Sequence, residues 1–154
     1  MLVHDPAARS YLFTALDSNP NICSYLLHGV SIEEADFSPD PLRFTIREVV
    51  AHLAEWDTIF LARMKQTLSQ DTPTLQEFDE GELAIEHDYA HSNIAEQLRL
   101  FRDHRTLLLD FLRPLSPHQW ERDCYHPRIG SMSMEALATL VSLHDSYHLR
   151  QLTE

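Results

Sequence analysis

The sequence predicts an all-α fold, a four-helix bundle with short accessory helices. Several long segments repeat apolar residues every three or four positions, which is the spacing of one face of a helix. No segment shows sustained alternation of polar and apolar residues with β-branched side chains, so strands have little support. At 154 residues the chain is long enough for a core that needs no disulfide or metal staple. We therefore expect one helical-bundle domain over residues 1–154.

The first expected helix begins at Asp5-Pro6, because a cap residue followed by proline is a favoured helix start. Ser18-Asn19-Pro20 is expected to interrupt it, since proline lacks the N–H that a helix interior needs. A second piece then runs over roughly residues 21–28, and Gly29 ends it as a C-terminal cap.

Two capping boxes follow, in which a Ser or Thr side chain and a Glu three positions later satisfy each other's backbone N–H groups. Ser31–Glu34 predicts a short helical turn, and residues 37–41 are expected to form a loop. Thr45–Glu48 predicts the start of a long helix that ends near Leu68. The apolar stripe of this helix contains Val49, His52, Leu53, Trp56, Phe60 and Met64.

The remaining elements follow from the same start and stop signals. We expect a break over 71–74, a short helix around 82–89, a long helix from Asn93 through Leu112 that Pro114 ends, a short helix from Ser116-Pro117, a loop over 123–131 and a last helix capped by Ser133.

The composition excludes several classes of partner. A net charge of −12 argues against nucleic acid and against anionic membranes, both of which require a surplus of Lys and Arg. No apolar run approaches the length of a membrane span, and the first residues lack a secretory signal pattern, so we expect a cytoplasmic protein. Cys23 and Cys124 lack CxxC spacing and are expected to be buried thiols.

The most informative motif is His144-Asp-Ser-Tyr-His148 near the C-terminus. Residues at i and i+4 share one face of a helix, and these two histidines continue an apolar stripe. Buried imidazoles need partners, so the pair predicts either a shared metal ion or two separately hydrogen-bonded core histidines. The motif also approaches the HExxH signature of zinc proteases, but Asp145 is short and lies about 100° around the helix from His144.

A catalytic metal site usually has three protein ligands, and His52 on the second long helix is the leading third candidate. Its alternative is a core histidine that donates to a backbone carbonyl. His87 and His91 form a rival i, i+4 pair in an acidic segment that is typical of a solvated turn. The other histidines expected at the surface are His4, His28, His104 and His118.

Four further residues have roles that the sequence leaves open. Glu55 and Gln151 lie one turn from His52 and His148, where they could orient the rings or simply face solvent. Cys124 and His126 precede the ligand helix, and either could complete the metal shell and so make the metal structural.

The segment Thr45–Trp56 contains a histidine, Trp120 is followed by a loop with His126 and Gly130, and the last helix carries the HxxxH motif. Together these features resemble the DinB-like superfamily of metal-binding helical bundles, which includes YfiT-type proteins. The similarity covers nearly the whole chain in element order. It implies that His52, His144 and His148 bind a divalent metal, with zinc or nickel expected, although three imidazoles also suit copper or iron.

The resemblance leaves the reaction open. Characterised relatives include thiol-dependent transferases, and the site also suits a hydrolase. We therefore expect a metal-dependent enzyme acting on a small molecule, with a low-molecular-weight thiol as a candidate partner. The alternative is a non-catalytic metal-binding scaffold. A homodimer is the expected assembly.

Overall fold

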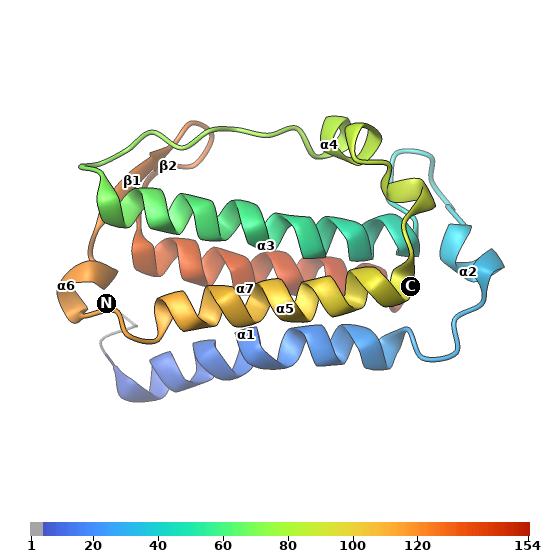
Figure 1. The fold of residues 1–154 in the computed structure, drawn as a ribbon, viewed down its shortest axis with the longest axis horizontal. Coiled ribbons are helices and arrows are strands. Elements are labelled where there is room, and N and C mark those ends of the chain that lie inside the picture. The colour runs from blue at the N-terminus through green and yellow to red at the C-terminus, as the bar shows by residue number, and fades with distance from the viewer. Residues whose placement is uncertain (1–4) are drawn as a thin grey trace.

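The structure, a computed structural model, describes residues 5–154. Four long helices form an elongated bundle (Figure 1), which confirms the predicted fold class. They are α1 (Pro6–Leu26), α3 (Ile46–Ser69), α5 (Ile94–Leu112) and α7 (Met134–Gln151). Helix α3 packs against α5 and α7, and α1 packs against the same two helices on the other side.

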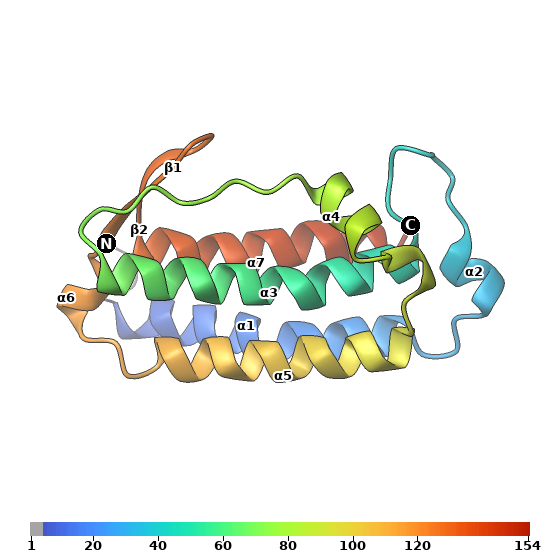
Figure 2. The same cartoon turned by 45° about the horizontal axis from the view of Figure 1, so that its top comes forward.

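The connection between α3 and α5 gives the bundle its topology. After α3 the chain runs back along the bundle to α4 (Glu80–Glu86) and the 3-10 helix η2 (Tyr89–His91), so α5 points in the same direction as α3 (Figures 1 and 2). Two backbone hydrogen bonds of 2.8 Å join this connection to the hairpin described below, from Leu75 N–H to the Tyr125 carbonyl and from Tyr125 N–H to the Pro73 carbonyl.

Most of the predicted helix starts are confirmed by their caps. The full capping boxes precede α2 (Ile32–Asp36), α3 and α6 (Pro117–Trp120), where a Ser or Thr hydroxyl accepts from the third residue and that residue's side chain accepts in return. Asp5, Asn93 and Ser133 cap α1, α5 and α7 through their side-chain oxygens. Residues 37–41 contain no helix or strand, as predicted.

The predicted interruption of the first helix is wrong, because α1 continues through Pro20 to Leu26. Proline cannot donate to the carbonyl four residues earlier, which belongs to Leu16. Arg105 of α5 supplies the missing donor, since its Nη1 lies 2.8 Å from the Leu16 carbonyl oxygen. A side chain from another helix therefore replaces the hydrogen bond that Pro20 removes.

The segment predicted as a loop over 123–131 is instead a β-hairpin. Strand β1 (Asp123–His126) pairs antiparallel with β2 (Gly130–Ser133), with Cys124 opposite Met132. Gly130 has φ of +99°, a conformation that few other residues adopt without strain. Each strand has only four residues, too few to show the alternation on which a strand prediction depends.

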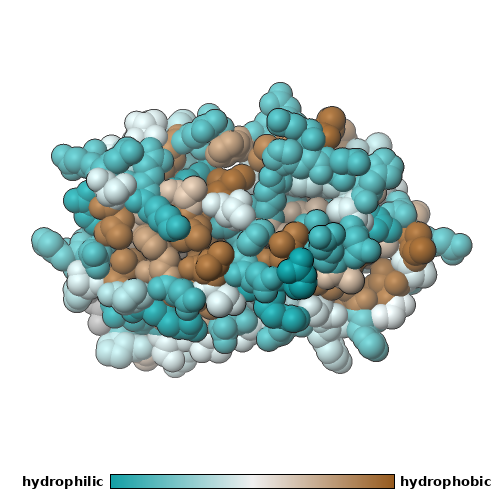
Figure 3. All heavy atoms as spheres, viewed as in Figure 1, coloured by the Kyte–Doolittle hydropathy of each residue, from teal (hydrophilic) through white to brown (hydrophobic). Residues whose placement is uncertain are grey.

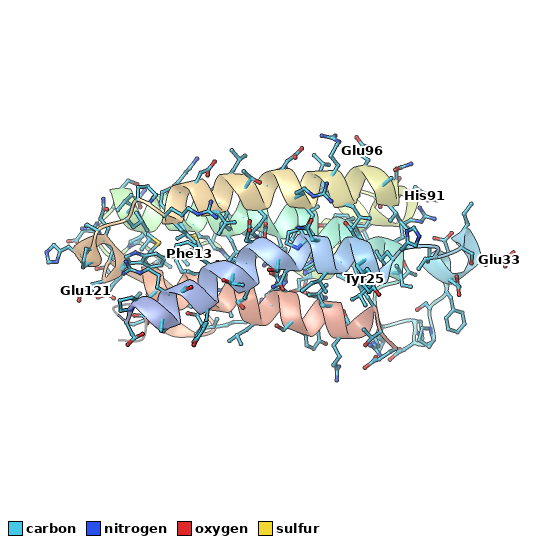
Figure 4. All side chains as sticks on the ribbon, turned by 90° about the horizontal axis from the view of Figure 1, so that it is seen from below. Phe13, Tyr25, Glu33, His91, Glu96 and Glu121 are labelled. Atoms are coloured by element: carbon cyan, nitrogen blue, oxygen red, sulfur yellow. The ribbon has the colours of Figure 1, made fainter. Side chains whose placement is uncertain are left out.

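The core lies along the axis of the bundle in two main clusters. The cluster at the hairpin end includes Trp56, Phe60 and Trp120, and the cluster at the opposite end includes Leu53 and Phe101. Phe13 of α1, labelled in Figure 4, packs edge-to-face on Trp120, with ring centroids 6.2 Å apart. The prediction of buried free thiols at positions 23 and 124 is confirmed.

The face seen in Figure 3 is mostly hydrophilic, with apolar areas between the polar side chains. Within residues 5–154 no helix has the length and apolar character needed to cross a bilayer. His28 and His118 are exposed as predicted, whereas His4 lies outside the described residues. The prediction for His104 is wrong: it is half-buried, and its Nδ1 lies 2.7 Å from the Ala54 carbonyl oxygen, so it donates to α3.

Candidate metal centre

Three histidines from two neighbouring helices meet in the bundle. His52 comes from α3, and His144 and His148 come from successive turns of α7. One ring nitrogen from each lies within 4.8 Å of the others, and Nε2 of His52 is 2.9 Å from Nε2 of His144. The three residues that the sequence predicted as ligands are thus placed together so that they could bind one metal ion.

The site favours neutral imidazoles. Burial, and then the neighbouring His148, lower the pKa of His52 to about 3. Burial, and then His52 and His148, also hold the pKa of His144 well below its ordinary value. The pKa of His148 is lowered by burial as well, although Gln151 opposes this effect. A neutral imidazole has a lone pair to donate, which is the state that binds metals.

Different contacts orient the three rings. The Gln151 side-chain oxygen accepts from Nδ1 of His148 at 2.7 Å, which leaves Nε2 as the nitrogen with the lone pair. His52 lies between the rings of Phe44 and Trp56, with centroids 5.3 and 4.9 Å away. Its buried Nδ1 has no hydrogen-bond partner among the described residues. Packing, with one polar contact, therefore fixes the directions of the rings.

Two residues were expected to orient the histidine rings. Gln151 contacts His148 as expected, whereas Glu55 does not contact His52. The Glu55 carboxylate accepts from the Tyr89 hydroxyl and pairs with His87, so it leaves His52 without a carboxylate partner. Glu55 lies one turn from His52 in sequence, but its side chain lies with His87 and Tyr89, next to α4 and η2. The sequence around Glu55 does not reveal these contacts, because Tyr89 and His87 are more than 30 positions away.

Replacing Gln151 with alanine should weaken metal binding about ten-fold to a hundred-fold, because His148 loses the acceptor that fixes its tautomer. Gln151→Glu keeps an acceptor and should bind at least as tightly as the parent protein. Competition against a chromophoric chelator measures both affinities. Equal affinities for the alanine variant and the parent would contradict the orienting role.

The donor set fits a divalent metal. Two imidazole Nε2 atoms 2.9 Å apart cannot both direct lone pairs at each other unless a proton or a cation lies between them. Tetrahedral zinc with bonds of about 2.1 Å would separate its nitrogen ligands by roughly 3.4 Å, which falls between the 2.9 Å of this pair and the 4.8 Å limit of the whole group. No other His, Cys, Asp or Glu in residues 5–154 joins this group.

Cys124 and His126, which could have completed the metal's coordination shell, are not part of the group of three histidines. Cys124 is buried beside Thr67 and Arg63, and burial raises its pKa. His126 of β1 accepts at Nδ1 from the Arg128 backbone N–H at 3.2 Å. Together with His144, His126 instead lines a cavity of about 280 Å³ between α3, α7, the hairpin and the connection after α3. One ligand histidine therefore borders a space for a small molecule.

Asp145, between the two histidines of α7, faces away from them. Its carboxylate accepts from Arg105 at 2.7 and 2.9 Å and from Asn19 at 2.8 Å. Arg105 also donates to both oxygens of Asp57. Because the Asp145 carboxylate is engaged in this buried network, it is not available as the general base of an HExxH-type site.

The rival pair of histidines does not converge. His87 pairs with Glu55, whereas Nδ1 of His91 lies 2.6 Å from the Asp88 carboxylate. His91 projects from the end of the bundle near the start of α5 (Figure 4), and its side chain is 81% exposed. The interpretation of this segment as a solvated turn is confirmed for both histidines, which are exposed.

The metal-free protein should lose stability as the pH falls below about 6.5. In the unfolded chain the histidines titrate near 6.5, whereas in the fold the pKa values of all three are lowered. The neutral forms favour folding, so this stabilisation is complete above pH 6.5 and is lost progressively below it. Each histidine contributes a slope of at most about 1.4 kcal/mol per pH unit.

Urea unfolding at pH 7.5, 6 and 5 measures this slope. His52→Leu should reduce it, whereas His118→Ala, whose side chain is 98% exposed, should leave it unchanged. An identical slope in all three proteins would show that the buried histidines do not titrate as described.

Comparison with known proteins supports the same fold and family. The model of the DinB superfamily matches residues 15–152. The chain is 28% identical over 138 residues to "putative metal-dependent hydrolase OB0782" of Oceanobacillus iheyensis, which covers 90% of this chain and 80% of that protein. It is also 28% identical over 112 residues to "putative metal-dependent hydrolase YfiT" of Bacillus subtilis, with 72% and 63% covered.

A solved structure of YfiT from Bacillus subtilis is described as a probable metal-dependent hydrolase with an unusual four-helix bundle topology. It matches this chain with a TM-score of 0.90 at 22% identity and covers 97% of this chain and 86% of that one. The predicted fold is therefore shared with an experimental structure. Because the family model matches residues 15–152, which is most of the chain, the chain belongs to the DinB superfamily.

Proposed function

We propose that the protein is a metal-dependent hydrolase that acts on a small molecule, with His52, His144 and His148 as the ligands of one divalent ion. The observation that carries this proposal is the cavity of about 280 Å³ that His144 borders. The names of the relatives, which describe metal-dependent hydrolases, point to the same chemistry. Zinc and nickel are the metals that we propose.

A divalent ion with three imidazole ligands has an open position, at which it can lower the pKa of water or polarise a carbonyl. The protein supplies the remaining functions. His144 and His52 present their nitrogens side by side, and Gln151 fixes the tautomer of His148. The aromatic rings of Trp56 and Phe60 pack against His144 and limit the access of bulk water to it.

Two alternatives predict different behaviour. A thiol-dependent transferase would need a low-molecular-weight thiol beside the metal, and a scaffold would need a metal enclosed by the core. The cavity beside His144 favours an enzyme over a scaffold. We further propose a homodimer and a cytoplasmic location, with neither nucleic acid nor a membrane as partner.

Ester hydrolysis tests the proposal. The chelator-treated protein, reloaded with zinc or nickel, should hydrolyse 4-nitrophenyl acetate faster than the metal-free protein, and His148→Ala should abolish the increase. Turnover that appears only when 2-mercaptoethanol is added, with transfer of the acetyl group to that thiol, would identify the transferase instead.

Cobalt substitution separates an enzyme from a scaffold. Titration with 2-mercaptoethanol should change the visible spectrum of the cobalt protein if a coordination position is open to the cavity. An unchanged spectrum at saturating thiol, together with no metal-dependent hydrolysis, would contradict the proposed function.

A further inference from the structure

Arg63 is a buried cation in the cavity beside His144. It lies on α3, two turns beyond Trp56, and only 6% of its surface is exposed. Its Nη2 donates to the Gln76 carbonyl at 2.8 Å, whereas its buried Nε has no hydrogen-bond partner. Among residues 5–154 no carboxylate lies within ion-pair distance of this guanidinium. The guanidinium lies over the Phe78 ring, 5.9 Å from its centroid, but the Gln76 carbonyl is its one hydrogen-bond acceptor among the described residues.

The other buried arginine shows what a satisfied site looks like in this fold. Arg105 is 1% exposed and makes five hydrogen bonds, four of them to the carboxylates of Asp57 and Asp145. Burying a cation without a counter-ion is strongly unfavourable, so buried charges in proteins are normally paired. Burial accordingly lowers the pKa of Arg63. The contrast indicates that the counter-ion of Arg63 comes from outside the chain.

The remaining charged groups at the cavity do not supply that counter-ion. Arg128, with 71% of its side chain exposed, pairs with Glu77 at 2.7 Å. Glu80 lines the cavity but forms no ion pair with Arg63, and burial raises its pKa. His126 is the other titratable neighbour, and its pKa is lowered by burial and then by Arg63. Glu77 also attracts Arg63 at longer range but forms no ion pair with it, so Arg63 has no directly paired carboxylate among the described residues.

The rest of the lining is apolar and includes Trp56, Phe60, Phe78, Ile129 and Leu140. Apolar walls with a few convergent polar groups, here Arg63, His126 and His144, are typical of a site for a small organic molecule. A planar guanidinium matches the two oxygens of a carboxylate, and hydrogen bonds of this kind are strong. An apolar body also fits these walls better than the hydration shell of inorganic phosphate does.

We propose that Arg63 binds the carboxylate of a small organic acid with an apolar body, which the cavity encloses. The proposal rests on the proposed function in one respect, namely that this acid is the class of substrate presented to His144. Binding of the carboxylate itself requires only Arg63 and the cavity, so it can be tested without any metal.

The probe is benzoate, titrated into chelator-treated protein at pH 8, where the imidazoles are neutral. Calorimetry should show one site per chain. Arg63→Met should weaken binding about ten-fold to a hundred-fold, as expected for the loss of hydrogen bonds between charged groups. Arg128→Met, which removes a solvent-exposed cation from the same cavity, should change the affinity less than three-fold. Arg63→Lys keeps the charge without the planar fork and should fall between the parent and Arg63→Met.

NMR of the parent protein gives a readout that does not depend on a variant's folding. The chain has two tryptophans, and benzoate should shift the indole N–H signal of Trp56, which lines the cavity, and leave that of Trp120 in place. Benzoate binding in the metal-free protein combined with no metal-dependent hydrolysis would retain this proposal and remove the proposed function.

Three results would overturn the proposal: no shift of the Trp56 signal at millimolar benzoate, equal losses of affinity in Arg63→Met and Arg128→Met, or tighter binding of inorganic phosphate than of benzoate. The second result would indicate general attraction of anions, and the third a phosphate site.

Discussion

Replacing His144 with alanine should reduce the affinity for zinc by about a hundred-fold to a thousand-fold. Zinc sites with four ligands bind with about 10 to 16 kcal/mol, so one ligand contributes on the order of 2.5 to 4 kcal/mol. His144 is central to the site, because its Nε2 lies next to that of His52 and its ring contacts both other histidines. Isothermal titration of chelator-treated protein with zinc, in competition with a chelator of known affinity, measures the loss.

His87→Ala is the matched control. His87 belongs to a similar HDxxH pattern, but it pairs with Glu55 and is not part of the group at His144. The control should keep the parent affinity within a factor of about two. If His87→Ala lost the metal and His144→Ala retained it, the assignment of the site would be wrong.

Arg105→Met should destabilise the protein by about 3 to 5 kcal/mol at pH 8, the range observed when one partner of a buried ion pair is removed. The variant leaves the carboxylates of Asp57 and Asp145, both at most 2% exposed, without their cation. It also leaves the Leu16 carbonyl without the donor that substitutes for Pro20. Urea unfolding followed by circular dichroism measures the change.

The loss in Arg105→Met should be smaller at pH 5 than at pH 8. Burial already raises the pKa of Asp57 to about 6, and without Arg105 it should rise further. A carboxyl group whose pKa is raised in the fold favours folding at low pH, and this contribution is lost as the pH rises through the folded pKa.

Arg99→Met, on the exposed side of the same helix, removes a surface pair with Asp103 and should change stability by less than about 0.5 kcal/mol. Similar losses of stability in Arg99→Met and Arg105→Met would show that the buried network contributes no more to stability than a surface ion pair.

The sequence predicts the bundle because its signals are local. Capping residues such as Thr45 and Ser133 act on the next three residues, and the apolar stripes depend on helical spacing alone. The ligand pair of α7 is predictable for the same reason, since i and i+4 always share a helix face. His52 is the leading third candidate from its place on the apolar stripe of its helix, but the choice between a metal ligand and a core histidine depends on the family resemblance.

The failures of prediction arise where distant residues decide local structure. Pro20 normally ends a helix, but Arg105, 85 positions away in the sequence, supplies the lost hydrogen bond. Glu55 has the right spacing to orient His52, but Tyr89 and His87 bind it instead. The hairpin over 123–133 gains stability from backbone bonds to the connection after α3, which no pattern within the hairpin reveals.

X-ray absorption spectroscopy of the zinc-loaded, untagged protein tests the central claim most directly, because it identifies the ligand atoms. Three imidazole nitrogens at about 2.0 to 2.1 Å, with one or two further oxygen ligands, are the expected shell. A sulfur ligand at about 2.3 Å, or fewer than three imidazoles, would show that His52, His144 and His148 do not form the metal centre.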